Sequence, residues 1–140
     1  MSTLEKAIVI ATQAHAGQID KGGNPYILHP LRIMLKMTTE ETRIAAVLHD
    51  VLEDTEVTED ELRAAGFHEK VIAAVVALTR QEEESYLEFI KRTKRDPVAR
   101  IVKLGDLEDN CDVTRIPNPT ETDLERIKRY KKAIHELLSS

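Results

Sequence analysis

The stretch AAVLHDVLED, residues 45–54, decides how the rest of this chain is organised. A histidine and an aspartate stand side by side, and two carboxylates follow within one turn, with apolar residues between them. That spacing is typical of a buried helix. On a helix, Glu53 projects from the same face as His49, and Asp54 from the same face as Asp50. The stretch therefore predicts one buried helix that presents four polar groups to a single pocket.

An imidazole nitrogen next to a carboxylate oxygen suits a borderline-to-hard divalent ion, which favours a metal site at His49 and Asp50. A plainer interpretation is also open. His-Asp pairs occur on many helices, and Glu53 and Asp54 could simply end this one in water. The metal interpretation gains weight only if other ligand-type residues stand in buried contexts elsewhere.

Two further positions meet that condition. His29 precedes Pro30, and proline suits the first turn of a helix, so His29 stands at a helix start, although a capping or core role for it is also open. Asp106 ends an apolar helical run, where a buried carboxylate requires a partner that a metal would supply. Asn110 follows four residues later on the same face. The candidate ligand set is thus two imidazoles and two carboxylates, namely His29, His49, Asp50 and Asp106.

The remaining segments also have helical spacing, and no stretch shows sustained strand alternation. Thr38 with Glu41 is expected to form a capping box for the His49 helix, and Thr58 with Glu61 repeats the pattern. The fold class is therefore all-α, a compact single-domain bundle over residues 1–140. About seven to eight helices are expected: from Ser2 or Thr3 to about Ala16, from Pro30 to about Met37, through His49, from Thr58 to Gly66, Val71–Leu78, Glu82–Lys94, from Pro97 past Leu104, and from Thr120 or Thr122 to about Leu138.

Composition narrows the class of protein. Hydrophobic residues make up 41% of the chain and charged residues 32%, an ordinary balance for a soluble domain. A net charge of −5 argues against a nucleic-acid polymer as partner. No apolar run approaches the roughly 20 residues that span a membrane. The single cysteine, Cys111, excludes an internal disulfide, and with no visible signal peptide we expect a cytoplasmic protein. The oligomeric state is left open.

At this point the chain resembles a known family, the HD-domain metal-dependent phosphohydrolases. More narrowly, it is similar to the hydrolase domain of RelA/SpoT-type enzymes and to stand-alone small alarmone hydrolases. Four pieces carry the resemblance in the family's order: AHAGQ (14–18), KGGNPYILHP (21–30), AVLHDVLEDT (46–55) and VKLGD (102–106) with Asn110. The resemblance implies the HD-domain type of helical fold and metal-dependent hydrolysis of guanosine 3′,5′-bis(diphosphate), ppGpp, at its 3′-pyrophosphate. This nucleotide is the alarmone of the stringent response.

The resemblance also implies roles for single residues. Mn²⁺ is the expected metal, although another divalent ion is possible, and its implied ligands are His29, His49, Asp50 and Asp106. Glu53 and Asp54 are the implied catalytic pair, which takes the proton of the attacking water or holds that water in line. The expected substrate-binding residues are Lys21 and Arg115 for the phosphates and Asn110 for the nucleotide.

Two departures from the family pattern keep alternatives open. Asp20 stands where many relatives carry an arginine that helps to hold the guanine base, and Leu107–Asn110 reads LEDN where longer relatives read Arg-x-His-Asn. One alternative is an HD phosphohydrolase that acts on another nucleotide or phosphorylated metabolite, which Asp20 favours. The other is a non-catalytic, metal-stabilised nucleotide-binding module, against which the complete Glu53–Asp54 pair argues.

Overall fold

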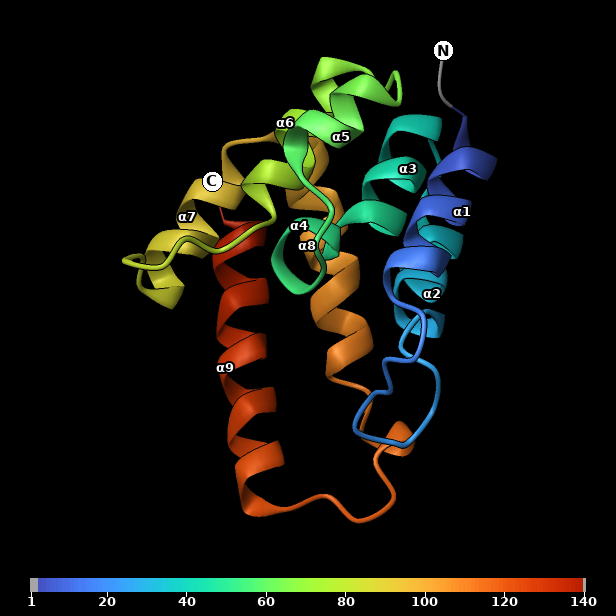
Figure 1. Ribbon diagram of the computed structural model, residues 1–140. Coiled ribbons are helices and arrows are strands. Elements are labelled where there is room, and N and C mark those ends of the chain that lie inside the picture. Colours follow the sequence, from blue (N-terminus) through green and yellow to red (C-terminus); the bar gives the residue numbers. More distant parts are fainter. Residues whose placement is uncertain (1–2, 140) are drawn as a thin grey trace.

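Helices joined by loops form the part of the chain that the structure describes (Figure 1). The computed structural model describes residues 3–139, apart from the side chain of Val113. Within those residues the only extended pairing is an isolated bridge between Ile19 and Pro25, so the all-α prediction is confirmed. The α-helices are α1 (Leu4–Ala14), α2 (Leu28–Lys36), α3 (Glu40–Leu48), α4 (Val51–Asp54), α5 (Glu59–Ala64), α6 (Glu69–Ala77), α7 (Tyr86–Lys94), α8 (Pro97–Asn110) and α9 (Glu121–Leu138), with a short 3-10 turn η1 (Val113–Arg115) after α8.

The helix α3 is the centre of the bundle. Its last five residues, IAAVL, are each 5% exposed or less, and the helix packs against α1, α2, α6 and α8. Val47 and Leu48 belong to the apolar cluster that faces α1, α5 and α6, whereas Ala45 and Ala46 belong to the cluster that faces α2, α6 and α8. Since both faces of α3 are covered, its carboxyl end delivers His49 to the interior.

The chain breaks its helix between His49 and Asp50. The helix α3 ends at Leu48, and Asp50 has φ −106° and ψ 0°, a turn conformation outside the helical region. A separate four-residue helix, α4, then begins at Val51. The prediction of one continuous helix through Asp54 is therefore wrong. The break lets the His49 side chain stay in the interior while Glu53 and Asp54 remain exposed.

Helix starts follow the capping residues, with two shifts from the sequence prediction. Thr39, not Thr38, caps α3, because its extended backbone lets its hydroxyl accept a hydrogen bond from the Thr42 N–H. The Thr42 hydroxyl accepts one from the Thr39 N–H, which completes the capping box. Ser85 caps α7, so this helix begins at Tyr86 and not at Glu82, where the sequence predicted its start. Thr3 caps α1, and Ser2 lies outside the described residues. Local hydrogen bonding by hydroxyl groups thus fixes the starts of α1, α3 and α7.

Close packing of α8 against α2 depends on Gly105. A Cβ at this position would lie 3.1 Å from Met37 Cε and 3.2 Å from Ile33 Cγ2, which is tighter than ordinary contact. The missing side chain therefore lets the two helices approach each other. The next residue, Asp106, reaches His29 near the start of α2 as a result.

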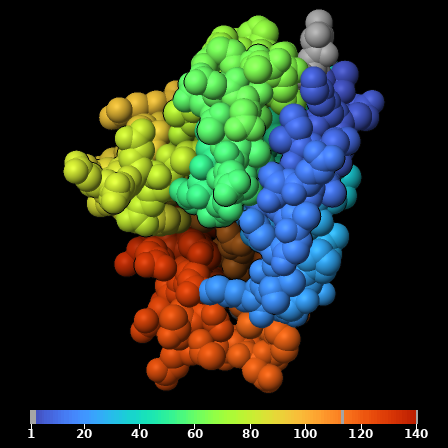
Figure 2. Space-filling view, in the orientation of Figure 1, coloured from blue at the N-terminus to red at the C-terminus, as the bar shows by residue number. Residues whose placement is uncertain are grey.

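Two irregular segments meet at one end of the bundle. The connection from α1 to α2 and the one from α8 to α9 lie side by side there (Figure 1), and a Cβ at Gly22 would collide with the carbonyl oxygen of Arg115. The helix α9 packs on α7 and α8 through a third apolar cluster that includes Phe89, Leu107 and Leu137. Figure 2 shows a hollow between α9, the α1–α2 connection and the region of α4, with α8 at its floor. Within residues 3–139, no helix combines the length and apolar character needed to cross a membrane.

The capping of α8 gives a test of how this helix is fixed. Asp96 Oδ1 accepts the N–H groups of Val98 and Ala99 at 3.0 and 2.9 Å, and Pro97 takes the first helical position. We expect Asp96→Ala to lower the free energy of unfolding by about 1 kcal/mol, measured by urea denaturation. Asp60→Ala, which removes a side chain that is 97% exposed, is the control and should change stability much less. Equal stability of Asp96→Ala and the wild type would show that the cap does not matter.

Candidate metal centre

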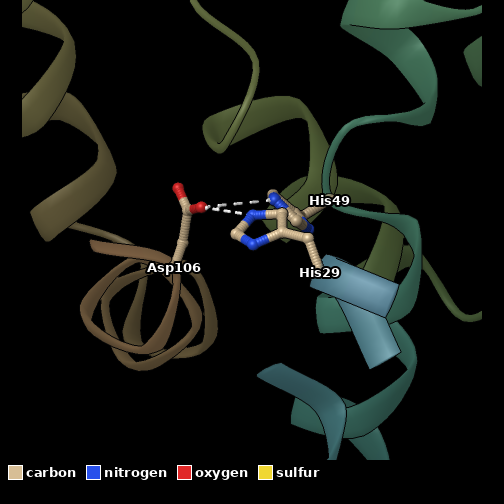
Figure 3. Close-up of side chains that lie close together, drawn as sticks. All are labelled: His29, His49 and Asp106. Carbon is tan, nitrogen blue, oxygen red and sulfur yellow. Dashed lines mark hydrogen bonds and ion pairs between the residues drawn. The ribbon is translucent and has the colours of Figure 1, made fainter. Parts of the chain in front are cut away.

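Three buried side chains from distant parts of the chain converge in the interior (Figure 3). His29 comes from the first turn of α2, His49 from the end of α3 and Asp106 from α8. Asp106 Oδ1 lies 2.8 Å from His29 Nε2 and 3.6 Å from His49 Nε2. One ligand atom from each residue falls within 4.8 Å of the others, a spacing that a single metal ion could share.

The His49 ring shows why a cation fits this cluster. Its Nδ1–H donates a hydrogen bond to the carbonyl oxygen of Ala46 at 2.7 Å, so in the neutral ring Nε2 carries the lone pair. Nε2 is buried without a hydrogen-bond partner, 3.1 Å from Asp50 Oδ2. Burial by itself lowers the pKa of His49, but Asp50 and Asp106 outweigh it and raise this pKa well above its ordinary value. Such a lone pair facing carboxylates requires a proton or a metal ion between them.

Asp50 joins this cluster to a second acidic group. Its carboxylate faces His49, and it also lies within 4.8 Å of ligand atoms of Glu53 and Asp54. The Tyr26 hydroxyl donates a short hydrogen bond to Asp50 Oδ2. Burial and the adjacent Asp50 raise the pKa of Tyr26, so the phenol stays protonated and keeps its donor. The sequence did not single out Tyr26, although it lies three residues before His29 in the same motif.

A partly buried lysine contacts the other oxygen of Asp106. Lys103 Nζ lies 2.8 Å from Asp106 Oδ2, and Asn110 Nδ2 donates to Asp106 Oδ1 at 3.1 Å. Burial by itself raises the pKa of Asp106, but Lys103 and the two histidines lower it well below the ordinary value. The carboxylate is therefore ionised, with Oδ1 turned toward the histidines. Sequence reasoning missed Lys103, which stands one helical turn before Asp106 on the same face.

His29 also has a second carboxylate partner. Its Nδ1 lies 2.5 Å from Asp109 Oδ2, and Asp109 is 4% exposed. Burial lowers the pKa of His29, whereas its hydrogen bonds with Asp106 and Asp109 raise it, and the net direction is upward. In the sequence, Asp109 stood out only as part of the LEDN departure from the family pattern. No neighbouring residue indicated that it would face His29.

The Glu53–Asp54 pair borders the cluster from the exposed side. Glu53 Oε1 accepts the backbone N–H of Arg80 at 2.8 Å, which ties α4 to the segment after α6. Partial burial and the neighbouring carboxylates raise the pKa values of both Glu53 and Asp54. A carboxylate with a raised pKa is a stronger base than an ordinary one.

A pocket of about 300 Å³ opens beside His29. It lies between the α1–α2 connection, the end of α8 and the first turns of α9, and Tyr26 and Asn110 also line it. The pocket wall that α9 supplies includes Arg126 and Tyr130. All three predicted substrate-binding residues, Lys21, Asn110 and Arg115, line this pocket.

Acidic partners already hold the cations of this pocket. Lys21 Nζ, on a side chain that is 54% exposed, lies 3.7 Å from Asp123 Oδ1. Arg115 lies 3.7 Å from Asp20 Oδ2. Asp20 in turn accepts the backbone N–H groups of Gly22 and Asn24 with its Oδ1, at 2.9 and 3.0 Å. Asp20 therefore shapes its own loop.

Comparison with known proteins places the chain in a family. The family model described as HD domain matches residues 7–104. The chain belongs to the HD domain family. The match covers α1 to the middle of α8 and includes the histidine-aspartate doublet at 49–50, so the resemblance inferred from the motifs is confirmed.

Curated relatives of this HD domain are much longer proteins. A guanosine-3′,5′-bis(diphosphate) 3′-pyrophosphohydrolase from Aquifex aeolicus is 37% identical over 119 residues, which cover 76% of this chain and 17% of that protein. A probable GTP pyrophosphokinase from Mycobacterium leprae is 31% identical over 132 residues, 85% of this chain and 17% of that protein. The chain thus spans about a sixth of the length of these relatives.

A solved structure confirms the fold of the HD domain. That protein is described as a metazoan ortholog of SpoT that hydrolyzes ppGpp and plays a role in starvation responses. The TM-score is 0.82 at 21% sequence identity, and the match covers all of this chain and 87% of the other.

Metal content gives a direct test of the cluster. We expect the purified HD domain to bind about one divalent ion, and His49→Ala and Asp106→Ala to lose it, because each removes a ligand atom. Chelation should lower the melting temperature of the wild type, since an ion that binds only the folded chain stabilises it. His135→Ala, at an exposed histidine of α9, is the control and should keep the ion. Equal metal content in all four proteins would exclude this site.

Proposed function

We propose that this HD domain is a metal-dependent phosphohydrolase that hydrolyses guanosine 3′,5′-bis(diphosphate) at its 3′-pyrophosphate. One observation carries the proposal: the buried cluster of His29, His49 and Asp106 adjoins a pocket at His29, and through the partly buried Asp50 it adjoins the exposed Glu53–Asp54 pair. The names of the curated relatives, and the ppGpp hydrolysis described for the metazoan SpoT ortholog, support the choice of substrate.

The proposed ligands are His29 Nε2, His49 Nε2, Asp50 and Asp106 Oδ1. Two imidazoles with two carboxylates suit a divalent transition metal that accepts both nitrogen and oxygen, and we propose Mn²⁺. Bound in such a site, a divalent ion offsets phosphoryl charge and lowers the pKa of a water nucleophile.

The chain's own groups then handle the proton. In the proposed reaction, water attacks the phosphorus bonded to the ribose 3′-oxygen, the bond between them breaks, and pyrophosphate leaves while the 3′-oxygen gains a proton. Glu53, with its raised pKa, takes the proton of the water, and Asp54 holds that water in line. Their exposed position on α4 gives solvent water access to this side of the cluster.

Cationic and amide groups of the pocket bind the rest of the nucleotide. Lys21 stands in a glycine-containing loop and contacts the distal phosphates as a point charge. Asn110 binds the ribose, and Arg115, which adjoins the same loop, binds a phosphate. The pocket volume of about 300 Å³ suits a nucleoside, with the phosphates directed toward His29 and the metal cluster.

One observation favours a second candidate, a phosphohydrolase of another nucleotide or phosphorylated metabolite. Asp20 and Asp123 add two carboxylates to the pocket wall, and both lie near the cations that would bind phosphate. Turnover of a nucleotide panel with Mn²⁺, with the products separated by chromatography, distinguishes the candidates. Cleavage of ppGpp to GDP and pyrophosphate supports the first, and preference for another substrate supports the second.

The proton-transfer role of Glu53 predicts a separation of activity from metal binding. We expect Glu53→Gln to keep its metal and to lose kcat by a factor on the order of 10²–10⁴. Glu56→Gln, a neutralised exposed neighbour, is the matched control and should keep wild-type kcat. Steady-state kinetics with a parallel metal assay checks both. A near-normal kcat for Glu53→Gln would remove Glu53 from the reaction.

The phosphate role of Lys21 predicts an effect on KM. We expect Lys21→Ala to raise KM for ppGpp roughly tenfold, equivalent to about 1.4 kcal/mol, with unchanged metal content. Lys70→Ala, at an exposed position of α6 away from the pocket, should leave KM unchanged. The comparison is made at fixed ionic strength, because salt screens an exposed cation. An unchanged KM for Lys21→Ala would move the phosphate site elsewhere.

A further inference from the structure

Asp109 is a buried acid outside the proposed ligand set. It lies on α8, three residues after Asp106, so both carboxylates project from one face of the helix. The His29 ring lies between them, with Nε2 2.8 Å from Asp106 Oδ1 and Nδ1 2.5 Å from Asp109 Oδ2. Since an ionised carboxylate can only accept a hydrogen bond, the Nδ1–H of His29 donates one to Asp109.

Two arginines from different elements hold the Asp109 carboxylate. Arg32 of α2 forms a two-pronged contact, with Nε 2.8 Å from Oδ1 and Nη2 3.0 Å from Oδ2. Arg115 of η1 donates to the Asp109 carbonyl oxygen, and its Nη2 lies 3.3 Å from Oδ2. Two-pronged, charge-assisted contacts are among the strongest and most directional hydrogen bonds. Asp109 is therefore fixed in position as well as neutralised in charge.

We propose that Asp109 is a positioning residue for the metal: it holds the Nδ1 proton of His29 and so presents Nε2 as the ligand atom. A histidine that binds a metal commonly donates its other N–H to a carboxylate, which fixes the tautomer and the ring orientation. Asp109 itself touches neither metal nor substrate. The inference rests on the proposed metal site, and it assigns the support of that site to the network of Arg32, Asp109 and Arg115.

The same network reaches the pocket loop. Arg115 also lies 3.7 Å from Asp20 Oδ2, and Asp20 holds the turn at Gly22 and Asn24. Asp20 and Asp109, which are far apart in the sequence, thus face one guanidinium group. The orientation of His29 and the position of the loop that carries Lys21 are linked through Arg115.

The experiment compares the wild type with Asp109→Asn, which keeps the shape of the side chain and removes its charge. Glu108→Gln, at the adjacent position with a side chain that is 61% exposed, is the matched control. Calorimetric titration with Mn²⁺ should give a dissociation constant that is roughly 10–100-fold weaker for Asp109→Asn and unchanged for Glu108→Gln.

Nuclear magnetic resonance of ¹⁵N-labelled histidine, with diamagnetic Zn²⁺ as the probe, separates positioning from general destabilisation. In the wild type we expect His29 Nδ1 to carry the proton and Nε2 to be metal-bound. Asp109→Asn should lose the single tautomer at His29, while His49, whose Nδ1 donates to Ala46, should keep its own.

The outcomes are distinguishable. If the wild type binds no divalent ion, the proposed metal site fails, and this inference with it. If the wild type binds and Asp109→Asn binds equally with an unchanged His29 signal, only the role of Asp109 is overturned. If Asp109→Asn does not fold, Arg32→Gln decides, because it loosens Asp109 and leaves the carboxylate in place. Weaker Mn²⁺ binding by Arg32→Gln supports the inference, and wild-type binding overturns it.

Discussion

The contact of Asp106 with the rings of His29 and His49 is the interaction on which the rest of the structure depends. It joins the consecutive helices α2 and α3 to α8, which lies far from them in the sequence, through side chains that are buried. Ionisable groups are costly to bury unless partners compensate them, so the surrounding helices have to place those partners accurately. The close approach of α8 to α2 at Gly105 serves this requirement.

The buried carboxylates are compensated by the histidines between them and by cations around them. Histidines and carboxylates form the centre, and the cations Lys103, Arg32 and Arg115 surround it. Lys103 binds Asp106 Oδ2, the oxygen turned away from the histidines, whereas Arg32 and Arg115 bind Asp109, whose Oδ2 also faces His29 Nδ1. The inner oxygens and the imidazole nitrogens are consequently directed at one another, which is the arrangement that a divalent ion requires.

The break at His49–Asp50 separates the proposed metal ligand His49 from the proposed catalytic pair Glu53 and Asp54. His49 points inward from the end of α3, whereas Glu53 and Asp54 lie on α4 at the surface. One continuous helix would have placed His49 and Glu53 on the same face. With the break, His29, His49 and Asp106 are buried, whereas the proposed base, Glu53, is exposed to the water that hydrolysis consumes.

The sequence by itself determined the helical class, most helix starts and the chemical types of the four proposed ligands. These properties depend on apolar spacing and on capping hydroxyls, which act within a few residues. Only the tertiary structure decided the break after Leu48 and the partners of the buried acids. Tyr26 and Asp109 carry no local signal, because each is defined by a contact with a residue far away in the sequence. Lys103 stands one turn before Asp106 in the same helix, and only the packing around α8 encloses that pair in the interior. Arg115 was predicted as a phosphate ligand from sequence, and only the fold revealed that it also links Asp20 to Asp109, since its contacts join segments that meet only after packing.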